Sequence, residues 1–308
     1  MAQSFALWAM VSGKPNWPLP VQCLPYPPLF SDGPAVTQVT GCGQSHFEIS
    51  MTDPILKTTD LTVRFGGHVA VDAVSCAFHA GELTAIVGPN GAGKTTYFNL
   101  ISGQIPASAG RVNLRGRDIT RASVSARTKA GIGRAFQLTN LFPGLSVLEN
   151  LRLVVQAKLG RGFNLWSMVS RHQDLTDQAE DILARVRLLD QRDQVVSELS
   201  HGNQRKLEVA LLIAQDPDVY MFDEPTAGMS VDEAPVVLDL IAELKEQKDR
   251  SILLVEHKMD VIRSLADRII VLHNGALAAD GAPAEVMASD VVQEAYMGRG
   301  LEGILADV

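Results

Sequence analysis

The sequence predicts an α/β fold built around a mainly parallel sheet. Two observations lead to this prediction: apolar runs typical of buried strands alternate with segments of helical periodicity, and a glycine-rich loop joins one such run to a helix. Strands that are apolar along their whole length are typical of parallel sheets with both faces covered by helices. With 308 residues, 46% of them hydrophobic, the chain is long enough to bury a sizeable core.

The first fifty residues differ in composition from the rest of the chain. They hold only three charged residues but seven of the fifteen prolines, which excludes a continuous helix. No basic stretch precedes the short apolar run at 5–11, so this run is a poor signal-peptide core. We expect residues 1–52 to be a disordered extension. One hypothesis is that it results from the choice of an upstream start codon, with Met51 opening the domain proper.

Strand patterns come first in the domain itself. Residues 55–78 carry β-rich runs around a Gly-Gly pair at 66–67, a pattern that predicts antiparallel strands joined by a hairpin. The apolar run at 83–87 predicts a buried strand, residues 94–101 the start of a helix, and residues 111–114 a short strand. A strand therefore precedes the glycine-rich loop, and a helix follows it.

The second half of the domain alternates helices with apolar strands. A polar and mostly helical stretch is expected from about 123 to 189, with amphipathic segments near 147–158 and 176–188. After this stretch, the sequence predicts a helix at 202–215 that begins at Ser200 or His201, a helix at 231–246, and strands at 219–222, 252–255 and 268–272.

The glycine-rich loop matches the pattern of a phosphate-binding loop. In that pattern, backbone N–H groups of a loop without bulky side chains point at a polyphosphate, and the next helix adds the positive end of its dipole. Lys94 is placed to reach the β- and γ-phosphates, and Thr95 to hold Mg²⁺. The full pattern disfavours a glycine-rich turn without function. It predicts that a nucleoside triphosphate is bound by Gly88, Pro89, Asn90, Gly91, Ala92, Gly93, Lys94, Thr95 and Thr96.

Two acidic residues, Asp223 and Glu224, follow the apolar run at 219–222. Ligands bind at the carboxyl ends of parallel strands, so acids at this position are expected to face the phosphates. We predict that Asp223 holds Mg²⁺ through a water molecule, and that Glu224 orients or deprotonates the attacking water. An Asp-Glu pair after a strand is by itself more often a solvated strand end. A complete phosphate loop earlier in the chain favours the functional interpretation.

Composition and charge disfavour several other functions. The 27 basic and 35 acidic residues give a net charge of −8, which argues against a dedicated nucleic-acid surface. No apolar run approaches the roughly 18 residues that a membrane-spanning helix needs. The three cysteines show neither the spacing of metal ligands nor a disulfide framework.

The motifs resemble those of the ATP-binding cassette (ABC) ATPases, in that family's order, from Leu56 to about Gly300. The run at 199–204 is similar to the ABC signature and keeps its serine, Ser200, and its second glycine, Gly202; two other positions depart from the commonest form. Ser200 is also a typical helix cap. The two interpretations are compatible, because a capped helix start attracts phosphate as well.

Three further residues match positions of this family. Gln137 matches the glutamine loop that touches Mg²⁺ and senses the transmembrane partner, and His257 matches the switch histidine that contacts the γ-phosphate. Phe65 lies where the family places an aromatic residue that stacks on adenine. Taken alone, Phe65 would indicate core packing and His257 a polar surface residue. Their order along the chain favours the family roles.

The resemblance implies the P-loop NTPase fold of an ABC ATPase, with an N-terminal antiparallel β subdomain beside the mainly parallel core. The ABC domain is expected at 53–300, its helical subdomain at about 138–200, and a tail at 301–308. Two cassettes are expected to pack head to tail, with each ATP between the loop of one and residues 200–202 of the other. The implied catalytic residues are Glu224, His257 and Lys94, and the implied magnesium ligands are Thr95, Gln137 and Asp223.

Residues 133–151 and the tail at 280–298 resemble the branched-chain amino acid importer ATPases, the larger of that system's two cassette types. This implies an ATPase on the cytoplasmic face of the plasma membrane that energises uptake of branched-chain or other amino acids. Its implied partners are a second cassette, two transmembrane permeases and, indirectly, a periplasmic or extracellular solute-binding protein. Such relatives more often carry Leu-Asn-Pro at 229–231, where this chain has Met-Ser-Val.

Three alternatives stay open at this point. Closely related cassettes serve urea and amide importers, and no residue of a cassette touches the transported solute, so the cargo rests on analogy. A non-transport ABC ATPase is disfavoured by the lack of a second cassette or long coiled coil in the chain. A scaffold subunit with a non-hydrolysing site is disfavoured by the intact motif residues Lys94, Asp223, Glu224 and His257.

Overall fold

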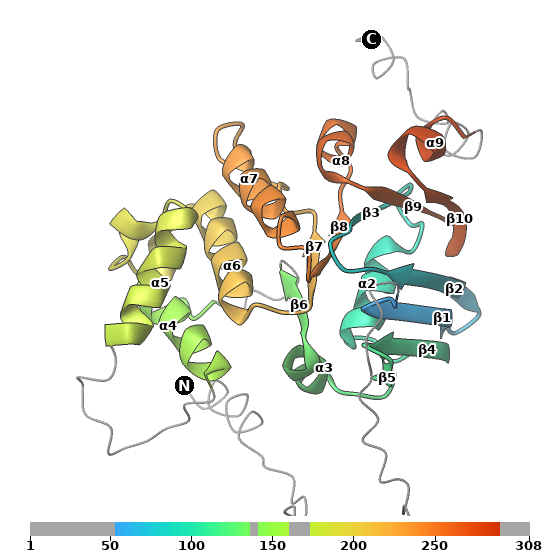
Figure 1. Cartoon of the computed structure of the whole chain (residues 1–308), viewed down its shortest axis with the longest axis horizontal. Helices are drawn as coiled ribbons and strands as arrows, with labels where there is room; N and C mark the ends of the chain where they lie inside the picture. Colours follow the sequence, from blue (N-terminus) through green and yellow to red (C-terminus); the bar gives the residue numbers. More distant parts are fainter. Residues whose placement is uncertain (1–52, 136–140, 160–172, 290–308) are drawn as a thin grey trace, which may run out of the picture. The chain divides into compact units, whose positions relative to one another are not determined.

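Figure 1 shows the computed structural model of the protein. The residues that the structure describes are 53–135, 141–159 and 173–289. Contacts divide the chain into two units, Met1–Ser50 and Met51–Val308, and every described residue belongs to the second unit.

An antiparallel sheet is built from β1 (Leu56–Phe65), β2 (His68–Phe78), β4 (Ala109–Leu114) and β5 (Arg117–Asp118). Its strand order is β2-β1-β4-β5. Strands β1 and β2 form the predicted hairpin, in which Phe65 pairs with His68. The turn between them favours a glycine, because Gly66 has a φ of 59°, in the left-handed region.

The second sheet is built from β3 (Leu83–Val87), β6 (Ile132–Ala135), β7 (Val219–Asp223), β8 (Ser251–Val255), β9 (Arg268–His273) and β10 (Ala276–Gly281). Its order is β10-β9-β3-β8-β7-β6, with parallel pairing throughout except for the antiparallel edge strand β10. The three central strands β3, β8 and β7 are buried along their whole length. The mainly parallel sheet predicted from the apolar runs is therefore confirmed.

The described helices are α2 (Lys94–Ser102), α3 (Val124–Ala130), α4 (Val147–Lys158), α5 (Gln173–Arg185), α6 (His201–Gln215), α7 (Ala234–Lys245), α8 (Met259–Leu265) and α9 (Pro283–Met287). Short 3-10 turns lie at Leu189–Gln191 and Val196–Glu198. Helices α4, α5 and α6 pack together on one side of the parallel sheet, whereas the antiparallel sheet lies on the other (Figure 1).

Strand β7 shows how the parallel sheet separates two hydrophobic layers. Tyr220 and Phe222 belong to the layer that holds the buried faces of α4, α5, α6 and α7. Val219 and Met221 alternate with them and belong to the layer that holds α2 and the antiparallel strands. Because both faces of the strand are covered, every position in it is buried, which explains its uninterrupted apolar sequence.

The structure corrects two expectations from the sequence, one about a strand and one about the start of a helix. The stretch at 123–189 was expected to be mostly helical, but it contains the sheet strand β6, whose residues are Ile-Gly-Arg-Ala. This strand lacks an apolar run because Leu212 and Pro217 lie directly over Gly133, where a side chain would not fit. Helix α7 begins at Ala234 rather than 231, with Pro235 in its first turn, where proline is favoured; Val231 lies in the turn before it and is 89% exposed.

Candidate nucleotide-binding site

The order of the parallel strands places three loops at one edge of the sheet. Strands β3, β8 and β7 are neighbours, so the segments that follow them leave at the same edge. The phosphate loop follows β3, His257 follows β8 by two residues, and Glu224 follows β7 directly. Asp223, predicted to come just after its strand, is the last residue of β7. Residues more than a hundred positions apart in the sequence therefore meet at this edge.

The phosphate loop is fixed by close contacts that only glycine permits. At Gly88, a Cβ atom would lie 2.1 Å from the carbonyl oxygen of Leu272, in β9. At Gly93, which has a φ of 97°, it would lie 2.6 Å from the carbonyl oxygen of Ala70, in β2. Both sheets therefore contact the loop. Glycines at these two positions are needed for this packing as well as for the approach of a ligand to the backbone.

Lys94 lies over the loop and closes it. Its Nζ donates hydrogen bonds to the carbonyl oxygens of Gly88 at 2.7 Å and of Pro89 at 3.1 Å. Burial lowers the pKa of Lys94, and the negative charges of Glu224 and Asp223 oppose this shift. The ammonium group is therefore partly desolvated and is stabilised by the charges of the two carboxylates.

A cleft of about 360 Å³ joins the loop to the other predicted residues. Its size lies in the usual range for small-molecule sites. The antiparallel sheet contributes Phe65, which is 50% exposed, together with His68 and Ala70. The remaining lining residues are Asn90, Gly91, Ala92, Gly93, Lys94, Thr95, Thr96, Glu224 and His257.

Glu224 and His257 contact one another across the mouth of this cleft. The Nε2 atom of His257 lies 3.0 Å from Oε1 of Glu224. Glu224 has a φ of 51°, unusual for a residue with a side chain, and its backbone N–H donates to the carbonyl oxygen of Val255 at 2.8 Å. Half-exposed side chains in this arrangement can reach a water molecule beside a phosphate in the cleft.

Arg134, which pairs with the buried Asp223, was not among the predicted site residues. Its Nη2 donates to Oδ2 of Asp223 at 2.9 Å, and the two side chains are 6% and 7% exposed. Burial raises the pKa of Asp223, and the charge of Arg134 opposes that shift. Burial lowers the pKa of Arg134, opposed in turn by Asp223. The pair keeps an ionised carboxylate at a position where an isolated charge would be unfavourable.

Glu256 is a second residue at this edge that sequence reasoning missed. It is 3% exposed, accepts a hydrogen bond from Thr226 Oγ1 at 2.6 Å, and accepts another from the backbone N–H of His257 at 2.8 Å. The carboxylate therefore links the loop after β7 to the residue that carries the histidine ring. The sequence signal that could have indicated Glu256 is its position, directly between an apolar strand and His257.

The predicted signature residues do not line this cleft. Ser200 caps α6, where its Oγ accepts the N–H of Asn203 at 3.2 Å, and it is exposed. Gly202 is buried under the carboxylate of Glu233, which leaves no room for a Cβ atom. Gln137 lies outside the described residues. The structure therefore brings together Lys94, Thr95, Glu224 and His257, and leaves Ser200 and Gly202 apart from them.

The donors and acceptors at the cleft suit a nucleoside triphosphate and a hard cation. The N-cap residue of helix α2 is Gly93, which has no side chain to accept hydrogen bonds from the first N–H groups of the helix. Because these N–H groups have no intrahelical partners either, they can donate to a phosphate. The oxygens of Thr95 and Asp223 are of the type that Mg²⁺ prefers, and such sites add phosphate oxygens of the substrate. In the described part of the chain, there is no cluster of three or more His, Cys, Asp or Glu side chains that could hold a metal ion.

Comparison with known proteins decides the family. The family model described as ABC transporter matches residues 71–227. The chain belongs to the ABC transporter family. The protein described as high-affinity branched-chain amino acid transport ATP-binding protein LivG, from Salmonella typhimurium, is 35% identical over 255 residues, which cover 80% of this chain and 99% of that protein. BraF of Pseudomonas aeruginosa, described in the same words, is 33% identical over 253 residues and covers 80% of this chain and 99% of its own.

Solved structures of ATP-binding cassettes share the fold of this cassette. A nucleotide-free cassette from an ABC transporter superposes with a TM-score of 0.68 at 28% identity, covering 80% of this chain and 99% of that chain. The ADP conformation of a cassette of an ABC transporter gives a TM-score of 0.68 at 29% identity, covering 80% and 100%. The expected fold, an ABC ATPase cassette with a mainly parallel core and an antiparallel sheet, is confirmed. Among the described helices, none is long and apolar enough to cross a membrane.

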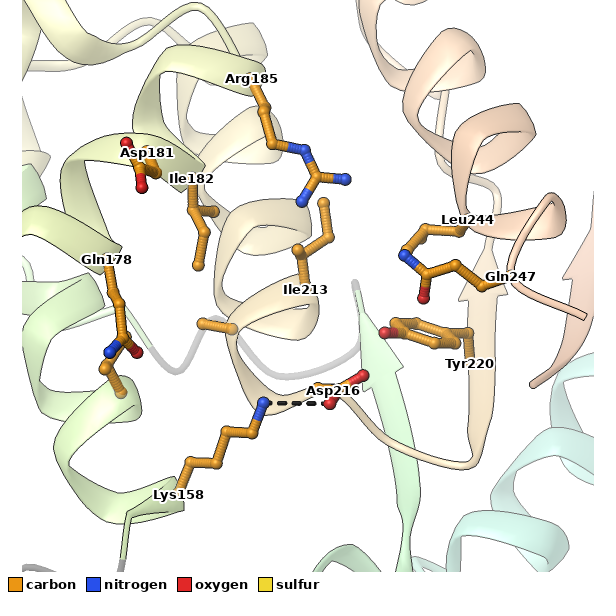
Figure 2. A pocket seen from close by; sticks show the side chains of 12 residues that line it. Lys158, Gln178, Asp181, Ile182, Arg185, Ile213, Asp216, Tyr220, Leu244 and Gln247 are labelled. Atoms are coloured by element: carbon orange, nitrogen blue, oxygen red, sulfur yellow. Dashed lines mark hydrogen bonds and ion pairs between the residues drawn. The ribbon is translucent and has the colours of Figure 1, made fainter. Parts of the chain in front are cut away.

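A second cleft, of about 320 Å³, lies beside the amino end of β7, between α4, α5, α6 and α7 (Figure 2). Lys158, at the end of α4, donates to Asp216 at 3.0 Å, and Arg185, at the end of α5, donates to Glu243 of α7 at 3.0 Å. None of the predicted site residues lines this cleft. Its ion pairs join α4 and α5 to the elements around the parallel sheet.

Proposed function

We propose that this cassette binds and hydrolyses ATP as the energising subunit of an ABC importer for branched-chain or other amino acids. The observation that supports hydrolysis most directly is the convergence of Lys94, Glu224 and His257 on one cleft at the carboxyl edge of the sheet. The cargo is supported by the names of relatives that this chain matches over 99% of their length.

Within the cleft, each side chain has a proposed role. Lys94 binds the β- and γ-phosphates, Phe65 stacks on the adenine, and His257 contacts the γ-phosphate. Glu224 orients or deprotonates the attacking water, with His257 within hydrogen-bond distance of the same carboxylate. When bound, Mg²⁺ would neutralise phosphate charge, held by Thr95, Asp223 and, by family resemblance, Gln137.

The signature residues support a dimer in which two cassettes share each nucleotide. Ser200 is exposed at the start of α6 and lies outside the nucleotide cleft of its own chain. We therefore propose that Ser200 contacts the nucleotide held by a second cassette, and that Gly202 does so once the Glu233 carboxylate over it is displaced. A γ-phosphate then contributes charge-assisted contacts to both subunits, so hydrolysis favours an open dimer.

The proposed partners and location follow from the proposed transport role. Two transmembrane permeases and, indirectly, a periplasmic or extracellular solute-binding protein complete the importer, with the cassette peripheral on the cytoplasmic face of the membrane. We further propose that the ABC domain covers 53–300, with its helical subdomain at about 138–200, after an extension at 1–52 and before a tail at 301–308.

Two measurements test this proposal in sequence. Phosphate release by the purified chain with Mg²⁺ and ATP tests hydrolysis, with Glu224→Gln as the variant expected to bind ATP without turnover. Co-purification with two polytopic membrane proteins, followed by uptake of labelled leucine into vesicles that hold the complex, tests transport. Uptake of urea but not of leucine would show that the proposed cargo is wrong and would favour a urea importer. ATP turnover by a chain that co-purifies with no membrane protein would favour a non-transport ATPase.

A further inference from the structure

The guanidinium of Arg134 connects three elements at the carboxyl edge of the sheet. It belongs to β6, and its Nη2 donates to Asp223 at the end of β7. Its Nη1 donates to two side chains of α2, Oδ1 of Asn99 at 2.7 Å and Oγ of Ser102 at 3.0 Å. Ser102 in turn donates to the carbonyl oxygen of Phe98 at 2.9 Å, which leaves its oxygen free to accept from Arg134.

Helix α2 begins with two residues of the candidate site, Lys94 and Thr95. Asn99 lies about one helical turn beyond Thr95. A single planar group therefore sets the position of the Asp223 carboxylate relative to the helix that starts at the phosphate loop. The Phe98 ring supports this position from the same helix, with the guanidinium carbon 5.4 Å from its centroid.

Fold stability alone does not account for a charged pair in this place. Buried ion pairs can often be replaced by apolar residues of similar volume without loss of stability, because desolvation offsets the attraction. The pair is also asymmetric. Among the described residues, the hydrogen bond from Arg134 goes to Oδ2 of Asp223, and Oδ1 accepts none. One carboxylate oxygen is held, and the other is available to a further ligand.

We infer that Arg134 is a positioning residue for the magnesium carboxylate: it holds Asp223 by one oxygen, in a fixed relation to α2, and leaves the other oxygen for the cation or its bound water. The inference rests on the proposed function, because it takes Asp223 and Thr95 as the groups that hold Mg²⁺. A carboxylate ordered in advance loses less freedom when the cation binds, so Mg²⁺ binding is tighter.

Nucleotide binding with and without the cation tests this role. The full chain and the variants Arg134→Lys and Arg134→Gln are titrated with a fluorescent ATP analogue, once in excess Mg²⁺ and once in EDTA. The dissociation constant in EDTA should stay within about twofold of the wild type, whereas the Mg²⁺ value should weaken about tenfold, as for other residues that orient metal ligands. Mn²⁺ bound to the complex, counted by electron paramagnetic resonance, should fall in parallel.

Matched variants separate positioning from folding. Arg250→Gln removes an arginine that is paired with aspartates at the other end of β7, and should leave both dissociation constants unchanged. Asn99→Ala removes one acceptor of the guanidinium but keeps the ion pair, so it should give a smaller shift in the same direction even if Arg134→Gln does not fold. In an Asp223→Asn background, adding Arg134→Lys should change the Mg²⁺ response no further.

Two results would overturn the inference while the proposed function stands. Equal weakening in Mg²⁺ and in EDTA would mean that Arg134 supports the fold only. Tighter Mg²⁺ binding by the variants would mean that the guanidinium competes with the cation. Failure of the proposed function has a different signature, because the wild type itself would then bind the nucleotide no better with Mg²⁺ than with EDTA, and both proposals would fall.

Discussion

The two ends of strand β7 carry basic–acidic pairs in different surroundings. At the carboxyl end, Arg134 and Asp223 are 6% and 7% exposed. At the amino end, Asp218 pairs with Arg115 and Arg250, and Asp216 pairs with Lys158 and Arg250, at exposures from 19% to 43%. Water and salt screen the second group, but little of either reaches the first.

This difference separates two uses of the same chemistry. Exposed pairs contribute little energy each, and the group at the amino end joins separate elements, α4 through Lys158 and the turn after β4 through Arg115. The stability of the buried pair depends strongly on both partners, because removal of one leaves an uncompensated charge. This dependence holds the two side chains in one arrangement, and it occurs at the end of β7 where the catalytic residues are proposed.

The largest expected effect is at the carboxyl end, on turnover. Glu224→Gln should lower kcat by about 10²–10⁴-fold, the usual contribution of a general base, while ATP binding is retained. Because the bound γ-phosphate would persist, the variant should accumulate as a dimer in ATP, measured by size-exclusion chromatography beside phosphate release. Asp218→Asn, at the other end of the strand, is the control and should turn over at the wild-type rate. Full turnover by the Glu224→Gln variant would show that Glu224 is not the catalytic carboxylate.

The next effect is on folding, and it compares the two ends directly. Arg134→Leu should lower the free energy of unfolding by about 3–5 kcal/mol, since it leaves Asp223 buried without its partner. Arg250→Leu, whose pairs are solvated, should cost no more than about 1 kcal/mol per pair. Urea unfolding of both variants measures the difference. Similar losses would show that burial does not distinguish the two ends.

A smaller effect concerns salt at the amino end. Asp218→Asn removes the carboxylate that pairs with Arg115 and Arg250, with an expected loss of about 1 kcal/mol or less per pair. In 1 M salt, where the Debye length is about 3 Å, this loss should largely disappear. The measurement is the urea midpoint of variant and wild type at low and high salt. A loss that persists at high salt would indicate that the pairs are less solvated than their exposure suggests.

The smallest effect is expected in the pH dependence of stability. Burial raises the pKa of Asp216, but the hydrogen bond from Lys158 and the charge of Arg250 outweigh burial, so the pKa lies below its ordinary value. A carboxyl group of this kind stabilises the fold above its unfolded-state pKa, about 4, and loses that contribution as pH falls through the folded-state pKa. Asp216→Asn should therefore make the loss of stability in acid shallower, as measured by urea unfolding from about pH 5 to 3. An unchanged slope would contradict the pairing.

The sign is reversed at the other end of the strand. Burial raises the pKa of Asp223, so the contribution of this group is present at low pH and is lost as pH rises through the folded-state pKa. The two ends of β7 are thus expected to respond to pH in opposite directions. Urea unfolding of the ligand-free protein across the same pH range compares the contributions of Asp216 and Asp223.

Much of the site was predictable because its signals are local. The phosphate loop lies between a strand and a helix that adjoin it in sequence, so its pattern appears in one short run. The cap of α6 by Ser200 and the hairpin turn at Gly66 are also set by residues next to one another. In the predicted helix α7, the apolar residues Val237, Leu240, Ile241 and Leu244 are buried together, because helical spacing alone determines which residues share a face.

Other elements were missed where tertiary packing overrides local preference. Strand β6 contains a glycine and an arginine in four residues, which is no strand signal. It forms because β7 offers a free edge with which it pairs in register from Ile132 to Ala135. The glycine is required by side chains from α6 and the turn after it, and the arginine forms the buried pair with Asp223.

The sequence by itself determined the fold class, the family resemblance and the groups that can do the chemistry, because each depends on the type and spacing of neighbouring residues. Only the tertiary structure decided which of those groups have partners. Arg134 and Asp223 are 89 positions apart, and Thr226 and Glu256 are 30 apart, yet each pair is in hydrogen-bond contact. The order of strands in the sheet brings these residues together, and burial determines the strength of their interaction. Neither strand order nor burial can be read directly from the sequence.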